Sequence, residues 1–256
     1  MVTGREEQMV KMRKIMILAV VGVMIHAGAF ALTGREVVDR SEEIASPDTA
    51  TSEVVMEIEK KGKVTEKVFT LTAMDTEDGE DRALIAFHKP SRIKLLTHAH
   101  KGKDDDQWLQ MSSGRVKRIS QSSKKKAFVN SHFTYEDIAS RDVDDYAYTL
   151  LGKETVAGEP CYMVESLRIR GKKVYDKTVL YISEKDWFLR KMDYYSKGKL
   201  LKILENKDIR TVDGILTPYE VVMSRAGNGG QTRLLLQEIR YNLPMKATDF
   251  RKESLR

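Results

Sequence analysis

The sequence of 256 residues contains a single cysteine, so no intramolecular disulfide can hold the fold together. Cys161 stands in the strand-like run Cys161-Tyr162-Met163-Val164, where we expect a small buried side chain and not a nucleophile. The motifs that carry chemistry are missing too: there is no nucleophile elbow, no His-Glu-x-x-His helix and no phosphate-binding glycine loop. Carboxylate pairs such as Glu42-Glu43 are adjacent and are not spaced across a cleft. The sequence therefore predicts that the protein is not an enzyme and needs no cofactor. Without disulfides, its stability is expected to come from a packed core.

Charge of one sign is not concentrated anywhere along the chain. The 44 basic and 38 acidic residues are dispersed, whereas a nucleic-acid-binding protein gathers its cations on one face among stacking aromatics. The one basic cluster, Lys124-Lys125-Lys126, lies in a serine-rich stretch. We interpret it as a solvated loop in preference to a phosphate contact. No nucleic-acid partner is predicted.

Long apolar runs are absent except at the N-terminus, where Arg13 and Lys14 precede the uncharged residues 15–31. A basic segment, an apolar segment and small residues in that order are typical of a secretory signal peptide. We predict a signal peptide over residues 1–31, with cleavage near Ala29 or Ala31. The alternative is an N-terminal membrane anchor, because the run approaches the roughly 18 to 20 residues that span a bilayer. Residues 32–256 are expected to form a single domain beyond the inner membrane.

Most of that domain has the period-two alternation of half-buried strands. A short helix over residues 35–44, with Thr33 as its cap, comes first, and the alternation begins at Thr51. Turn sequences such as Asp213-Gly214 and Asn228-Gly229-Gly230 divide it into about 10 or 11 strands. Short connections of this kind join antiparallel strands.

Residues 120–145 interrupt the alternation and are interpreted as a polar loop with one or two short helices. A large antiparallel sheet curls, and too few elements are left to fill its inner face. The fold class that we predict is mainly β with helical inserts: a curled antiparallel sheet that forms an incomplete, half-open barrel covered by short helices. The other face is expected to meet water and not lipid, since it would carry charged side chains: Glu57, Glu66, Lys94, Lys202 and Glu238.

Several motifs in collinear order resemble the LolA-like family of outer-membrane lipoprotein-sorting proteins. They extend from about Arg35 to the C-terminus: Asp106-Gln107-Trp108-Leu109-Gln110, Gly114-Arg115-Val116-Lys117-Arg118-Ile119, Phe133-Thr134-Tyr135-Glu136-Asp137-Ile138, Tyr148-Thr149-Leu150-Leu151-Gly152, Cys161-Tyr162-Met163-Val164-Glu165, Asp208-Ile209 to Asp213-Gly214-Ile215-Leu216-Thr217-Pro218 and Ile239-Arg240-Tyr241-Asn242. The chain departs from the family pattern at Gln110-Met111-Ser112-Ser113 and at Asn130-Ser131-His132.

The resemblance implies a periplasmic chaperone that shelters lipid or lipoprotein acyl chains in an apolar cavity and carries them between the inner and outer membranes. Its partners would be the cargo, an inner-membrane transporter and an outer-membrane acceptor, and the protein would be a monomer. The alternative is an accessory lipid-binding or sensor protein that works with an RND-type transporter or a signalling partner.

Candidate lining residues are apolar side chains on the strands that the alternation turns inward: Met56, Phe69, Leu71, Leu95, Met192, Leu201, Ile203, Val221, Met223 and Leu236. Candidate lid residues are the apolar side chains of the interrupting segment: Phe128, Phe133, Tyr135 and Ile138. Methionine suits a lining because its flexible thioether adapts to chains of varied shape.

One further constellation could bind a metal. His98 and His100 lie two residues apart on a strand-like run and precede Asp104-Asp105-Asp106, a set that could ligate Zn²⁺ or Cu²⁺. We favour the alternative, a polar hairpin tip around Gly102 without a metal.

Overall fold

The alternating segments of the sequence form a curled antiparallel sheet. The structure is a computed structural model that describes residues 32–76 and 80–255. The predicted signal peptide falls on residues 1–31, outside the described residues. Residues 32–256 form one compact unit. Among the described residues, no helix combines the length and the apolar character needed to cross a bilayer.

The described residues contribute thirteen strands to this sheet. Their bounds are β1 (Thr49–Lys60), β2 (Lys63–Met74), β3 (Arg82–Lys89), β4 (Lys94–His98), β5 (Asp106–Gln110), β6 (Val116–Arg118), β7 (Tyr146–Val156), β8 (Glu159–Arg168), β9 (Lys177–Ser183), β10 (Leu189–Ser196), β11 (Lys199–Val212), β12 (Ile215–Arg225) and β13 (Gln231–Tyr241). The helical elements are α2 (Gly34–Glu42) and the short 3₁₀ helices η1 (Gln121–Ser123), η2 (Phe128–Asn130), η3 (Val143–Asp145), η4 (Ala247–Phe250) and η5 (Lys252–Leu255).

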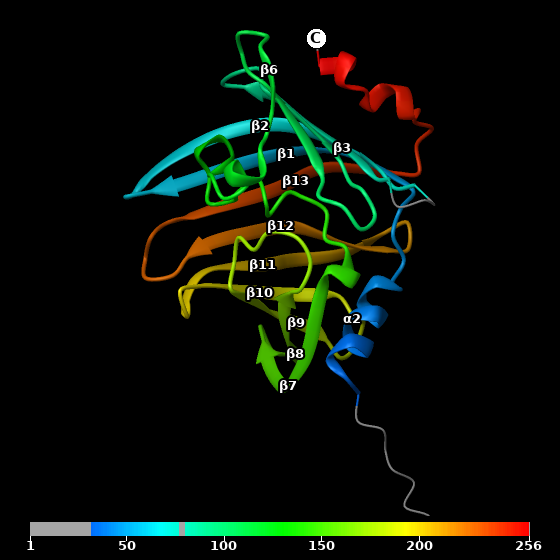
Figure 1. Ribbon diagram of the computed structural model, residues 1–256, viewed down its shortest axis with the longest axis vertical. Coiled ribbons are helices and arrows are strands. Elements are labelled where there is room, and N and C mark those ends of the chain that lie inside the picture. Colours follow the sequence, from blue (N-terminus) through cyan, green and yellow to red (C-terminus); the bar gives the residue numbers. More distant parts are fainter. Residues whose placement is uncertain (1–31, 77–79, 256) are drawn as a thin grey trace, which may run out of the picture. The chain divides into compact units, whose positions relative to one another are not determined.

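The strand order is β6-β5-β4-β3-β2-β1-β13-β12-β11-β10-β9-β8-β7, and every pairing is antiparallel. Neighbouring strands of the sheet are therefore consecutive in the chain everywhere except at the centre, where β1 pairs with β13 (Figure 1). The two edge strands, β6 and β7, are consecutive in the chain. Residues 120–145, which we call the insert, connect them and pass over the inner face of the sheet (Figure 1).

The predicted fold class is confirmed: the protein is mainly β, and its antiparallel sheet is curled and not closed. The number of strands exceeds the predicted 10 or 11, because β5 and β6 have only five and three residues. Runs as short as these carry too little alternation to be counted from sequence.

Helix α2 forms where the sequence predicts a helix. Thr33 caps it with a reciprocal pair of hydrogen bonds: the Glu36 backbone N–H donates to Thr33 Oγ1 (3.2 Å), and the Thr33 N–H donates to Glu36 Oε2 (2.7 Å). Such a capping box satisfies backbone donors that the first helical turn leaves free. The buried side chains of Val37 and Val38 anchor the helix against β7, β8 and β9.

The two faces of the sheet carry different apolar clusters. On β4, Leu95 packs into a cluster on the inner face, and the next residue, Leu96, packs on the outer face with Phe250 and Leu255 of η4 and η5. Successive side chains of a strand point to opposite faces, so this division follows from the pleat. The C-terminal 3₁₀ helices thus cover the outer face of β3 and β4, while the insert covers the inner face.

Candidate functional site

A tight turn in the insert directs aromatic side chains onto the inner face of the sheet. The Phe128 N–H donates to Phe133 O (2.8 Å), the Ser131 N–H donates to Phe128 O (2.8 Å), and Ala127 and Thr134 form an isolated β-bridge. Val129 and Asn130 adopt left-handed backbone conformations, with φ of 43° and 65°. This reversal brings the side chains on both arms of the turn to the same face.

The insert side chains complete two apolar clusters. Phe128 and Tyr135 pack into the cluster formed by β1 to β5, and the Phe128 ring lies 5.7 Å from the ring of Phe87. Phe133 packs into the second cluster, formed by α2 and β8 to β12. Ile138 contacts both clusters. Phe128 is fully buried, although it belongs to a 3₁₀ helix of only three residues.

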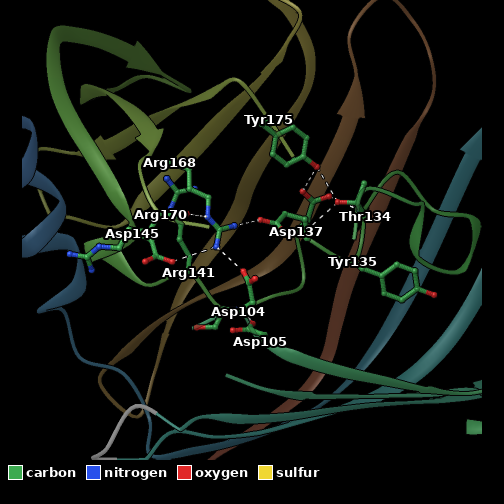
Figure 2. Close-up of polar contacts among 12 residues, drawn as sticks. Asp104, Asp105, Thr134, Tyr135, Asp137, Arg141, Asp145, Arg168, Arg170 and Tyr175 are labelled. Atoms are coloured by element: carbon green, nitrogen blue, oxygen red, sulfur yellow. Dashed lines mark hydrogen bonds and ion pairs between the residues drawn. The ribbon is translucent and has the colours of Figure 1, made fainter. Parts of the chain in front are cut away.

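Asp137 fastens the insert to the sheet at a buried ion pair. Its carboxylate pairs with the ammonium group of Lys202 on β11, and the two side chains are 0% and 4% exposed. It also accepts hydrogen bonds from the Thr134 N–H (2.6 Å) and from the Tyr175 hydroxyl (2.7 Å), as Figure 2 shows for Thr134 and Tyr175. Burial raises the pKa of Tyr175, and the neighbouring carboxylate adds to the effect. The hydroxyl therefore remains a donor to Asp137 at neutral pH.

Lys202 is an unusual lysine. Its Nζ atom lies 5.1 and 5.0 Å from the ring centroids of Tyr175 and Tyr194. Burial lowers the pKa of the ammonium group, and the carboxylate of Asp137 opposes that shift. A buried charge of this kind is tolerated only because it has a partner of opposite sign.

A second set of ion pairs, centred on Arg168, holds the same half of the insert. The Arg168 guanidinium on β8 donates to Glu136 Oε1 (2.6 Å). It also donates to Asp145 Oδ2 (3.4 Å) and lies 3.6 Å from Asp104, and Figure 2 labels these three residues. Burial raises the pKa of Glu136, and Arg168 opposes this shift. Nearby, Arg141 donates to Ser166 Oγ (2.5 Å) and Thr178 Oγ1 (3.3 Å). We call the Asp137–Lys202 and Glu136–Arg168 contacts the insert ion pairs.

Two hollows flank the insert. The first, of about 330 Å³, lies between the insert and β8 to β11, and both apolar and charged side chains line it, among them Met192, Tyr194, Leu204, Arg141 and Arg168. The second, of about 790 Å³, is lined mainly by residues of the insert, the β1–β2 turn and β10 to β12. Val174 and Tyr175 belong to the walls of both hollows.

Most of the predicted lining and lid residues come together on the inner face. Met56, Phe69, Leu71, Leu95 and Leu236 lie in the first cluster with Phe128 and Tyr135, and Met192, Val221 and Met223 lie in the second with Phe133. Within the described residues, the insert side chains fill the space above these positions. The inner face is therefore covered by the protein's own aromatics, and the hollows beside them are partly polar.

One of the two predicted positions on β11, Ile203, needs correction. Ile203 pairs with Ser224, while the adjacent Leu204 pairs with Met223. Directly opposed residues of an antiparallel pair point to the same face. Leu204 therefore shares the inner face with Met223, and Ile203 points to the outer face. Leu201 lies at the bulge opposite Tyr194 and Tyr195 and contributes to the wall of the second hollow.

The same register shows that our prediction for Lys202, which placed it on the water-facing side of the sheet, was wrong. It pairs with Tyr194 and points inward, where it is 3% exposed. Lys124, interpreted as part of a solvated loop, is also 3% exposed, while Lys125 and Lys126 are exposed.

The two histidines of the metal constellation have separate partners. His98 Nε2 lies 2.6 Å from Phe250 O, and the ring of His100 lies between Glu80 (2.8 Å) and Asp106 (3.4 Å). Among the described residues, no group of three or more metal-ligating side chains converges. Cys161 is fully buried on the outer face with Val179 and Tyr181.

The sequence profile of a family of uncharacterized proteins matches residues 79–256. No curated protein matches the chain. Among solved structures, a DUF1329 family protein from Desulfovibrio piger is 30% identical, with 87% of this chain and 98% of that chain covered and a TM-score of 0.82. A putative outer membrane lipoprotein-sorting protein domain from Vibrio parahaemolyticus is 25% identical, with 87% and 97% covered and a TM-score of 0.82. A LolA superfamily protein from Nitrosomonas europaea shares the fold at 20% identity, with 88% and 100% covered and a TM-score of 0.68.

Proposed function

Because this chain belongs to a LolA-like family, we propose that it is a periplasmic carrier that shelters the acyl chains of a lipid or lipoprotein. In this proposal the cargo occupies the inner face of the sheet, and the insert is the lid that yields to it. An inner-membrane transporter would supply the cargo and an outer-membrane acceptor would receive it.

One observation carries the proposal: the inner face is covered by a segment with little regular structure, and not by a long helix or a second sheet. The insert contains only short 3₁₀ helices, and it is held by side-chain contacts such as the insert ion pairs, yet it buries Phe128, Phe133 and Tyr135 against the sheet. Apolar surface of this extent would normally be covered by a helix or a second sheet. The aromatic side chains of such a loop can leave the sheet when another apolar group, such as an acyl chain, takes their place.

The free energy that opening the insert costs is comparable to the free energy that burying an acyl chain recovers. Exposing a buried apolar side chain costs about 1.5 to 3 kcal/mol, so releasing the four lid residues Phe128, Phe133, Tyr135 and Ile138 costs roughly 6 to 12 kcal/mol. Burying one sixteen-carbon acyl chain, at about 0.8 kcal/mol per CH₂, recovers on the order of 12 kcal/mol. The insert should therefore stay closed in the absence of cargo and open when an acyl chain takes its place.

The test uses the delipidated protein and a fluorescent phospholipid or fatty acid. We expect binding at micromolar concentration. The double variant Asp137→Asn/Lys202→Met, which removes one insert ion pair without leaving a buried charge, should take up the probe faster. Lys207→Met, which removes an exposed lysine from the same strand, is the matched control and should bind like the unmodified protein. A folded protein that binds neither probe would refute the carrier function.

A further inference from the structure

All the charged side chains that line the second hollow are basic. Five of the residues that line it are basic: Lys60, Lys61, Lys125, Lys202 and Arg225. Among the described residues of its wall, none is acidic. In a chain whose charges are otherwise dispersed, this concentration of cations around one cavity stands out.

Four of these cations have no acidic partner among the described residues, and three of the four are exposed. Lys202 is paired with Asp137, and the ammonium group of Lys60 donates to Asn130 O (2.7 Å) and Asn130 Oδ1 (3.0 Å). In contrast, no acidic side chain within the described ranges forms an ion pair with Lys61, Lys125 or Arg225. Their side chains are exposed at the rim, so a ligand can reach them.

The fold forces these cations together. Lys202 and Arg225 are direct cross-strand partners on β11 and β12, and like charges in that position are destabilising. The β12–β13 turn also lies close to the end of β1: a Cβ atom on Gly230, whose φ is +87°, would come within 2.3 Å of Glu59 O. Glu59 itself points to the outer face, because the inner-face residues of β1 are Val54, Met56 and Ile58. The hollow therefore keeps its positive charge despite an acidic residue next to Lys60 in sequence.

The rest of the wall of the hollow is uncharged and mixes polar and apolar side chains, and its apolar part leads toward the inner face. Phe133 and Tyr175 line the hollow, and both pack in the apolar cluster of α2 and β8 to β12. His132 adds no charge at neutral pH, because burial lowers its pKa and Lys60 and Arg225 act in the same direction. The cavity thus has a cationic rim and a partly apolar inner wall. A volume of about 790 Å³ falls in the range of small-molecule sites.

We propose that the second hollow binds the phosphate group of an anionic amphiphile, whose acyl chains extend beneath the insert. This inference rests on the proposed carrier function and names a class of cargo for it. Lys61, Lys125 and Arg225 would contact the phosphate oxygens through charge-assisted hydrogen bonds. Phe133 and Tyr175 would contact the first carbons of the chains.

The test compares three proteins with two lipid probes. The proteins are the unmodified chain, the triple variant Lys61→Gln/Lys125→Gln/Arg225→Gln, and a control triple variant, Arg115→Gln/Lys117→Gln/Lys185→Gln. The control removes the same charge from exposed positions outside the hollow. The probes are a fluorescent phosphatidic acid and an uncharged fluorescent diacylglycerol with the same acyl chains.

We expect the unmodified protein and the control to bind phosphatidic acid about tenfold more tightly than diacylglycerol, a preference that salt weakens. The first triple variant should lose that preference and bind diacylglycerol normally. Equal affinity for both probes, or a preference that survives in the first triple variant, would overturn this inference and leave the carrier function intact. Failure of every protein to bind either probe would contradict the carrier function itself.

Calorimetric titration with inorganic phosphate alone separates a lipid headgroup from free phosphate. Affinity in the millimolar range or weaker supports the headgroup, since the acyl chains then supply most of the binding. Micromolar affinity for phosphate alone, without a preference for phosphatidic acid over diacylglycerol, would overturn the headgroup assignment.

Discussion

Asp137 joins the insert to two other parts of the chain through a single side chain. Its fully buried carboxylate receives a backbone N–H from within the insert, a hydroxyl from Tyr175 and the ammonium group of Lys202. These three donors come from separate segments of the chain. A single carboxylate therefore links the insert to β11 and to the segment before β9.

We predict that Asp137→Asn lowers the free energy of unfolding by about 3 to 5 kcal/mol, because it leaves the charge of Lys202 buried and unpaired. Lys202→Met should cost less, since the Thr134 N–H and the Tyr175 hydroxyl still bind the carboxylate. The double variant Asp137→Asn/Lys202→Met should recover most of the loss. Urea unfolding at pH 7 of all four proteins gives the coupling energy. If the two single losses simply add in the double variant, the pair is not the contact that we describe.

The inward position of Lys202 illustrates what the sequence could not show. Strand β11 carries apolar residues at both alternations, with Leu201 and Ile203 on one and Leu200 and Leu204 on the other. Hydropathy favours the alternation without the lysine, but the ion pair with Asp137 makes the lysine acceptable inside. Because Asp137 lies 65 residues earlier in the chain, no local pattern can reveal the pairing.

Among the elements, α2 depends on a close approach to the sheet. Gly34 opens the helix and lies against the backbone of β7: a Cβ atom there would come within 2.7 Å of Leu150 N and within 2.7 Å of the Thr149 carbonyl carbon. The neighbouring atoms are backbone and cannot turn aside. Glycine is needed at this position because the absence of a side chain lets α2 approach the backbone of β7, and not because the backbone must be flexible.

We predict that Gly34→Ala destabilises the protein by about 1 to 3 kcal/mol, the range for overpacking, although alanine is the better helix former. Thermal unfolding followed by circular dichroism measures the loss. Ser41→Ala, at a half-exposed position of the same helix, is the control and should be neutral or slightly stabilising. A Gly34→Ala variant as stable as the unmodified protein would mean that α2 does not dock on β7 as described.

The elements differ in how far sequence determines them. Thr33 and Glu36 specify the start of α2 locally, and Gly-containing turns separate the long strands, so both were predictable. The insert was predicted as irregular, and its aromatic side chains were identified. Its path was not predictable, because contacts such as His132 N–H to Thr232 Oγ1 (3.0 Å) join residues 100 positions apart.

At the scale of the whole sheet, the chain divides into two halves joined at the centre. Residues before the insert form β1 to β6, and residues after it form β7 to β13. The halves meet at the β1–β13 ladder, which runs from Ala50 opposite Tyr241 to Glu59 opposite Gln231. The covalent connection between the halves is the insert.

We predict that the two halves stay associated after the insert is cut. A short protease recognition sequence placed between Lys125 and Lys126, which are exposed, allows cleavage of the folded protein. The fragments should co-elute in size-exclusion chromatography and separate only in denaturant, because the central ladder is intact. The uncut protein with the same insertion is the control. Fragments that separate under native conditions would show that the insert, and not the ladder, holds the halves together.

The strand order has a consequence for any change in the width of the sheet's opening. Its two margins, β6 and β7, are separated by every other strand within the sheet but by only one segment along the chain. That segment acts as a tether whose contour length limits how far the margins can part. Lengthening or shortening it would alter the aperture while leaving every ladder of the sheet as it is.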